Sequence, residues 1–146
     1  MTVDFATFCC AKDRDKLYES LHLHIDSHSY AFNDVHVIHQ MVKVGDLPLT
    51  ENMQFYQIKE EDIDVILEEN GINPNNAEAD KYTHGKGAAH YWKAHCVNHL
   101  KALSESTADY IVLSDADCHM TSKTDWINEG IVRLRANPLT LVVSPP

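Results

Sequence analysis

Short apolar segments alternate with amphipathic segments along the chain, and this alternation limits the fold more than any other feature. Val3–Cys10 is apolar and β-branched, whereas Asp13–His28 places Leu17, Leu21 and Ile25 four residues apart, as on one face of a helix. Repeated strand and helix patterns are typical of a parallel sheet whose connecting helices cover its faces. We therefore expect an α/β domain with a mostly parallel sheet flanked by helices.

The remaining elements continue this alternation. The expected strands share apolar, β-branched or aromatic residues, and the expected helices share apolar residues at helical spacing. The sequence contains no internal repeat and no segment of markedly different amino-acid composition, so residues 1–146 are predicted to form a single domain. Further strands are expected at Val35–Met41, Phe55–Ile58, Tyr110–Leu113 and Leu139–Val143, and further helices at Glu60–Asn70, Ala88–Ser104 and Ser122–Arg135.

The charge balance excludes one class of partner. The chain has 22 acidic and 12 basic side chains and a formal net charge of −10. Phosphate neutralisation needs a basic face, so we expect no nucleic acid partner. The first residues carry no basic leader pattern, and no apolar run reaches the roughly 18 residues of a membrane span. The four cysteines form neither CxxC pairs nor a dense framework, so free thiols and a cytoplasmic protein with no transmembrane segment are expected.

Histidines are frequent, with ten in the chain. His22, His24 and His28 fall in the first expected helix and are interpreted as a solvated face. His95 and His99 lie four residues apart on a later helix, a spacing that can bind zinc. The HExxH pattern is incomplete there because Cys96 occupies the position of its Glu, so a zinc site is not expected.

Two aspartates follow the strongest expected strand. Asp115 and Asp117 come after Tyr110–Leu113, and His119 lies two residues further on, where it is either a further metal or phosphate ligand or a solvated turn residue. Ligands in open α/β sheets bind at the carboxyl ends of the strands. Carboxylates in such a turn suit Mg²⁺ or Mn²⁺, which prefer oxygen ligands, and the implied partner is a diphosphate whose charge the metal neutralises. The alternative is ordinary turn chemistry, in which Asp hydrogen-bonds its own backbone.

The segment from His95 to Asp117, HCVNHLKALSESTADYIVLSDAD, resembles the glycosyltransferases of the GT-A fold, particularly the large family 2 group. In that group a helix leads into a strand that ends in an Asp-x-Asp metal motif. The N-terminal FATFCCAKDRDKLYESLHLHI is similar to the family's first strand and helix, where the loop after the strand contacts the nucleotide base. The resemblance implies a GT-A-like, Rossmann-like sheet that binds a nucleotide-diphosphate sugar.

Site residues follow from this resemblance. Asp115 and Asp117 would hold Mn²⁺ or Mg²⁺ and the donor diphosphate, with His119 as a further candidate ligand. His95 or Asn98, on the helix packed beneath the donor site, would line it. The base would lie against the loop formed by Ala11, Lys12, Asp13 and Arg14.

Two departures from the family pattern bear on function. His39 and Gln40 stand at the end of the second expected strand, where family members often place an acidic residue that binds the base or ribose. The family's general base, usually a carboxylate, lies well downstream of the metal motif. We therefore expect it beyond Pro146, and we expect this chain to be the N-terminal donor-binding part, without the acceptor side.

The leading hypothesis is a metal-dependent, hexosyltransferase-like glycosyltransferase that moves a sugar from a nucleotide diphosphate donor to a hydroxyl of a glycan, lipid or protein. The alternative is a non-catalytic module with the same fold that binds a nucleotide sugar or a partner. Nucleotidyl transfer ranks last, because it favours a glycine-rich loop after the first strand and AKDRDK contains no glycine.

Overall fold

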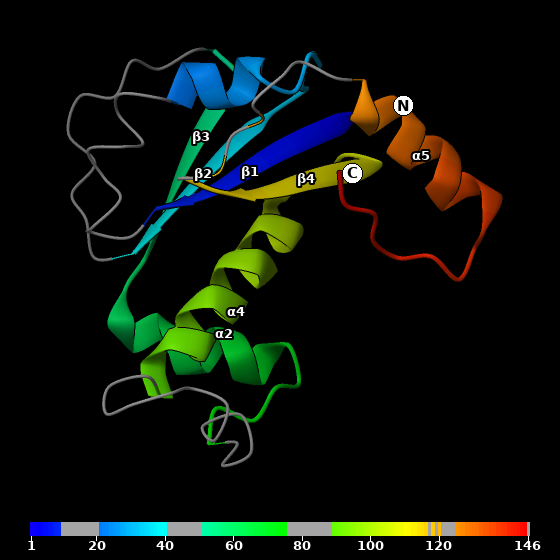
Figure 1. Cartoon of the computed structure of the whole chain (residues 1–146). Helices are drawn as coiled ribbons and strands as arrows, with labels where there is room; N and C mark the ends of the chain where they lie inside the picture. Colours follow the sequence, from blue (N-terminus) through cyan, green and yellow to red (C-terminus); the bar gives the residue numbers. More distant parts are fainter. Residues whose placement is uncertain are drawn as a thin grey trace.

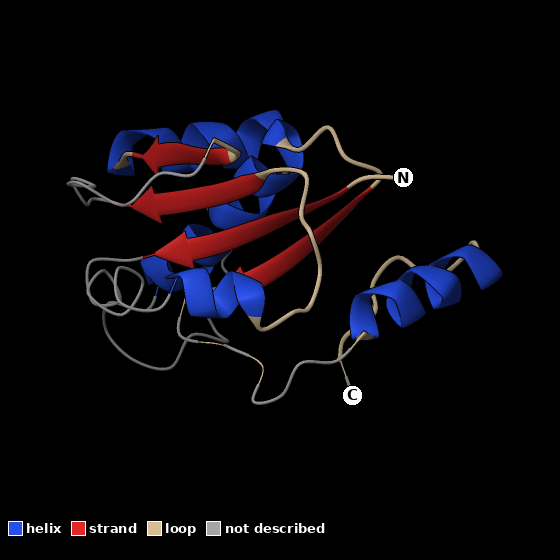
Figure 2. Cartoon of the chain, turned by 90° about the horizontal axis from the view of Figure 1, so that it is seen from above, coloured by secondary structure: helices blue, strands red, loops and turns tan. Residues whose placement is uncertain are grey.

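Four parallel strands form one sheet in the order β3-β2-β1-β4 (Figure 1). The computed structural model describes residues 1–9, 21–40, 51–75, 89–116, 118, 120 and 125–145. In Figure 2 all four strand arrows point the same way. The α/β prediction with a parallel sheet is thereby confirmed. The strands are β1 (Val3–Cys9), β2 (Val35–Gln40), β3 (Met53–Ile58) and β4 (Tyr110–Asp115).

Helices cover both faces of this sheet (Figure 1). The helical residues 21–26 pack on one face, and α5 (Trp126–Ala136) joins the same hydrophobic core. On the other face lie α4 (Ala89–Glu105) and α2 (Ile63–Glu69), which follows the 3₁₀ turn η1 (Glu60–Asp62). The strands are covered on both faces, as parallel sheets generally are.

Alternating side chains of β1 divide the core into two layers. Phe5 points into the layer that contains Val37 and Ile131, whereas Ala6 points into the layer of α2 and α4. Successive side chains of a strand point to opposite faces, so an uninterrupted apolar run is the expected pattern for a strand buried on both sides. All residues of β1 and β2 are buried accordingly.

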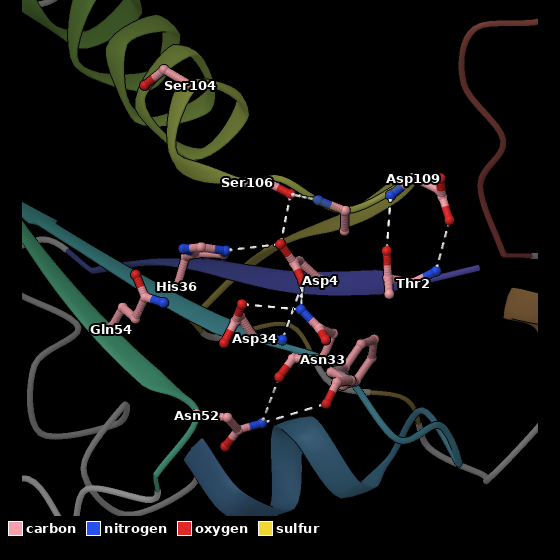
Figure 3. Close-up of polar contacts among 12 residues, drawn as sticks. Thr2, Asp4, Asn33, Asp34, His36, Asn52, Gln54, Ser104, Ser106 and Asp109 are labelled. Atoms are coloured by element: carbon pink, nitrogen blue, oxygen red, sulfur yellow. Dashed lines mark hydrogen bonds and ion pairs between the residues drawn. The ribbon is translucent and has the colours of Figure 1, made fainter.

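A buried carboxylate joins the amino ends of the strands (Figure 3). Asp4 in β1 is 0% exposed. Its Oδ2 accepts hydrogen bonds from His36 Nε2 at 3.1 Å and Ser106 Oγ at 2.6 Å, and its Oδ1 accepts from Asn33 Nδ2 at 3.2 Å and the Asp34 amide at 3.1 Å. Burial raises the pKa of the Asp4 carboxyl, but these hydrogen bonds outweigh it and leave the pKa below its ordinary value.

The two histidines expected on a solvated helix face are buried instead. His24 is 1% and His28 4% exposed, and both rings contact Phe5, whereas His22 is exposed as predicted. His24 lies three residues after Leu21, on the apolar side of the helical residues 21–26, and His28 lies in the turn that follows them. The apolar body of the imidazole allows it to fill this core position beside aromatic rings.

The strand predicted at Leu139–Val143 is wrong. Residues 140–145 form no regular structure, and Leu139, Leu141 and Val142 are 87%, 88% and 82% exposed. After α5, the amides of Leu139 and Thr140 bond to Asn137, in a turn. Apolar β-branched residues favour a strand only where a neighbouring strand pairs with their backbone groups.

Among the described helices, none has the length and apolar character needed to cross a membrane. Cys96 is a free thiol.

Candidate functional site at the carboxyl ends of the strands

Asp115 is the last residue of β4 and is exposed at the carboxyl end of the sheet. Its backbone carbonyl accepts a hydrogen bond from the amide of Cys118 at 3.0 Å, which closes a tight turn. The next amide, of Ala116, donates to the carbonyl of Phe8 in β1 at 3.3 Å. The turn that presents the Asp115 carboxylate is therefore fixed to the neighbouring central strand.

The strand order places this turn at a particular point of the sheet. From β1 the chain continues to β2 on one side, whereas β4 pairs with β1 on the other side. The strand order therefore reverses between β1 and β4, because β2 and β3 lie on one side of β1 and β4 lies on the other. In open α/β sheets ligands bind in the crevice at this reversal of strand order. Asp115 lies at this position.

The strand register also assigns Asp115 to one face of the sheet. Asp115 is paired with Phe8, and residues in register on parallel strands point to the same side. Phe8 packs in the core layer of α4, where its ring lies 4.6 Å from the ring of His99. The Asp115 side chain therefore emerges on the α4 face. On that face, the ring of His99 in α4 packs at a tilt against Phe8, the residue paired with Asp115.

Asn98 is hydrogen-bonded to Gln40 at the end of β2, and this buried polar pair is called the Gln40–Asn98 bracket below. Gln40, the last residue of β2, donates from its Nε2 to the carbonyl of Ala94 at 2.9 Å and to Oδ1 of Asn98 at 3.0 Å. Asn98 is 9% exposed. Since β1 lies between β2 and β4, this bracket and Asp115 are separated by two strand spacings, or roughly 10 Å. An extended ligand, rather than a single ion, could contact both.

His95 contributes its backbone to this helix face. Its carbonyl accepts a hydrogen bond from Nδ1 of His99 at 2.7 Å. A carbonyl can only accept, so Nδ1 of His99 carries a proton. The side chain of His95 is half-buried.

The other predicted site residues lie outside the described residues. These are Asp117 and His119 of the metal motif, and Ala11, Lys12, Asp13 and Arg14 of the base-contacting loop. Among the residues that the structure describes, no group of three His, Cys, Asp or Glu side chains is arranged to hold a metal ion. Asp115 is the one predicted metal ligand that the structure describes.

Sequence reasoning missed the roles of Gln40 and His99. The sequence indicated both positions, Gln40 at a strand end and His99 four residues after His95. The missing information was the register, which brings Gln40 against α4 and places His99 over Phe8.

Comparison of the chain with protein-family models, with curated proteins and with solved structures finds no match. Its function is therefore argued from its own residues.

Proposed function

We propose that the chain is a metal-dependent glycosyltransferase of the GT-A type, similar to family 2, or the donor-binding part of one. The observation that carries this proposal is the position of Asp115. An exposed carboxylate, the first of an Asp-x-Asp pair, lies at the carboxyl end of β4, beside β1, where the strand order reverses. Nucleotide ligands bind at this place in open parallel sheets.

The chemistry of the pair suits a divalent cation. Asp115 and Asp117 would supply hard oxygen ligands to Mn²⁺ or Mg²⁺, with His119 as a further candidate. A cation held by these residues would supply positive charge against the departing diphosphate. The net charge of −10 makes this requirement stronger, because an acidic protein otherwise repels a diphosphate.

The rest of the donor would lie along the carboxyl ends of β1 and β2. The Gln40–Asn98 bracket stands two strands away from Asp115, and the Asn98 amide group is a hydrogen-bond donor beside it. His99, over Phe8, lies between the two. A nucleoside diphosphate bound in this way would place its base near residues 11–14 and its phosphates near Asp115.

Calorimetric titration with UDP, GDP, CDP and ADP, each with and without Mn²⁺, tests the proposal. We expect one nucleotide to bind only when Mn²⁺ is present, and Asp115→Asn to weaken that binding at least about tenfold, or about 1.4 kcal/mol. Glu69→Gln is the matched control, because it removes one negative charge from an exposed position at the end of α2. Binding that needs no metal, or that Asp115→Asn and Glu69→Gln change equally, contradicts the proposal.

A turnover assay separates the enzyme from a non-catalytic nucleotide-sugar-binding module. Hydrolysis or transfer of the nucleotide sugar that is stopped by a chelator and by Asp115→Asn supports the enzyme. Metal-dependent binding without turnover supports the module.

A further inference from the structure

Two residues just after the helical residues 21–26 form hydrogen bonds with residues that follow Asp115 in the chain. Ser27 lies just beyond the helical residues 21–26, and its Oγ donates a hydrogen bond to the carbonyl of His24 at 2.7 Å. The same Oγ accepts a hydrogen bond from the backbone amide of Met120 at 3.3 Å. Trp126, the first residue of α5, donates from its indole Nε1 to Nδ1 of His28 at 3.2 Å. Met120 and Trp126, which both follow β4 in the chain, are thus attached to the same helix end.

The contact with Trp126 requires a neutral His28. An indole N–H can only donate, so Nδ1 must be the acceptor and Nε2 must carry the ring proton. A protonated imidazole would place a second N–H opposite the indole N–H and break the hydrogen bond. Burial lowers the pKa of His28, which favours the neutral ring at neutral pH.

Among the described residues, the groups in contact with His28 are mainly aromatic rings. The rings of Phe5 in β1, Phe32 and Trp126 lie within 6.0 Å, and His24 of the helical residues 21–26 lies at 5.8 Å. Nε2 of His28 is buried and has no hydrogen-bond partner among the described residues.

His28 also lines a small cavity of about 150 Å³ that reaches the turn after β4. The titratable groups that the described residues contribute to its lining are His28 and the Cys118 thiol, and no carboxylate is among them. Ser114 and Cys118, on either side of Asp115 and Ala116, share this lining with His28 and Trp126. His28 therefore lies across this cavity from Ser114 and Cys118, whose backbone flanks Asp115 and sets the direction of its side chain.

We propose that Ser27 and His28 are positioning residues for the turn at Asp115, with Ser27 holding Met120 and neutral His28 holding Trp126. This inference rests on the proposed function, because the turn matters for catalysis only if Asp115 binds the metal and diphosphate. Protonation of His28 releases Trp126 and loosens the turn, so donor binding falls in mildly acidic solution. Neither residue contacts the donor.

The first test follows amide and indole NMR signals of the whole chain between pH 8 and pH 5, without nucleotide. We expect the Trp126 indole signal and the amide signals of Ala116 and Cys118 to move with one common midpoint below about 6.5, the ordinary histidine pKa. In His28→Asn, whose Oδ1 can accept the indole N–H but does not titrate, these signals should stay in place. His22→Asn, at an exposed position of the helical residues 21–26, should leave the transition intact.

The second test measures binding of the nucleoside diphosphate with Mn²⁺ at pH 7.5 and 5.5. We expect the Kd of the wild type to rise about tenfold more than that of His28→Asn, within the usual range of coupling between sites. Ser27→Ala should weaken binding at both pH values without removing this difference, because the lost contact with Met120 does not titrate.

These outcomes distinguish the positioning role from the proposed function. If Ala116 and Cys118 do not respond to pH, or respond equally in His28→Asn, the positioning role is refuted even where nucleotide binds. If they respond as expected but no nucleotide binds with Mn²⁺, the proposed function is refuted and the link between His28 and the turn is supported.

Discussion

The Asp4 carboxylate should be among the most sensitive positions of the fold. Asp4→Asn keeps the size of the side chain but replaces one acceptor oxygen by an NH₂ group. Each carboxylate oxygen accepts two hydrogen bonds, and the single amide oxygen of Asn can replace only one of these acceptors, so the hydrogen bonds of the other pair are lost or must be rearranged. Removing a charged acceptor from buried hydrogen bonds costs roughly 1.5–3 kcal/mol, because the donors that lose it stay buried. This is a large part of the about 5–15 kcal/mol that stabilises a typical domain.

Urea unfolding followed by circular dichroism measures this loss. Asp34→Asn is the matched control, since the Asp34 carboxylate accepts one exposed hydrogen bond from Asn33, and we expect it to cost less than about 1 kcal/mol. The pKa of Asp4 is lowered in the folded state, so its contribution is complete above the ordinary carboxyl pKa and is lost as the pH falls through the folded value. The difference between wild type and Asp4→Asn should therefore shrink below about pH 4. An Asp4→Asn protein within 1 kcal/mol of the wild type at pH 7 would refute the reasoning.

Three further outcomes are expected from unfolding measurements. Phe5→Ala should lower the free energy of unfolding by about 3–5 kcal/mol because Phe5 is fully buried, whereas Leu141→Ser, at 88% exposure, should change it by less than about 0.5 kcal/mol; similar values for the two would contradict the described core. Gln40→Ala should lower the free energy of unfolding by about 1–3 kcal/mol, since it removes the hydrogen bonds that Gln40 donates to the Ala94 carbonyl and the Asn98 oxygen; an unchanged free energy would contradict these two hydrogen bonds. Because the pKa of His28 is lowered in the folded state, the unfolded chain binds this proton more tightly, so stability should fall as the pH drops below about 6.5; an equal fall in His28→Asn would assign the effect elsewhere.

Periodicity was sufficient to predict most of the described elements. The strand at Tyr110–Leu113 and the helix at Ala88–Ser104 were expected close to where β4 and α4 lie, because a short apolar run and a 3.6-residue repeat are local signals. The strand expected at Leu139–Val143 failed because strand formation depends on a partner strand, which no local pattern contains.

The environment of the histidines needed tertiary information. The sequence shows His24 and His28 on the same helix as Leu21 and Ile25, but polarity alone assigned them to solvent. Their burial against Phe5 and Trp126 depends on segments that are distant in the sequence. The same is true of Asp4, whose partners His36 and Ser106 lie 32 and 102 residues away.

The location of the candidate site was partly predictable. An aspartate pair directly after an apolar strand was predicted to lie at the carboxyl end of the sheet, where ligands of open parallel sheets bind, and Asp115 does lie at the carboxyl end of β4. The order β3-β2-β1-β4, which puts Asp115 beside β1 at the reversal of strand order, arises from long-range pairing and could not be read from spacing.

The most direct test of the central claim is paramagnetic broadening by Mn²⁺ of the backbone amide signals, with the nucleoside diphosphate present. We expect the signals of Ala116 and Cys118, next to Asp115, to broaden at low Mn²⁺ concentrations, and that of Leu67 in α2 to stay sharp. The broadening should disappear in Asp115→Asn and persist in Glu69→Gln. Broadening elsewhere in the chain with Ala116 unaffected, or equal broadening in the two variants, would contradict a metal and diphosphate site at Asp115.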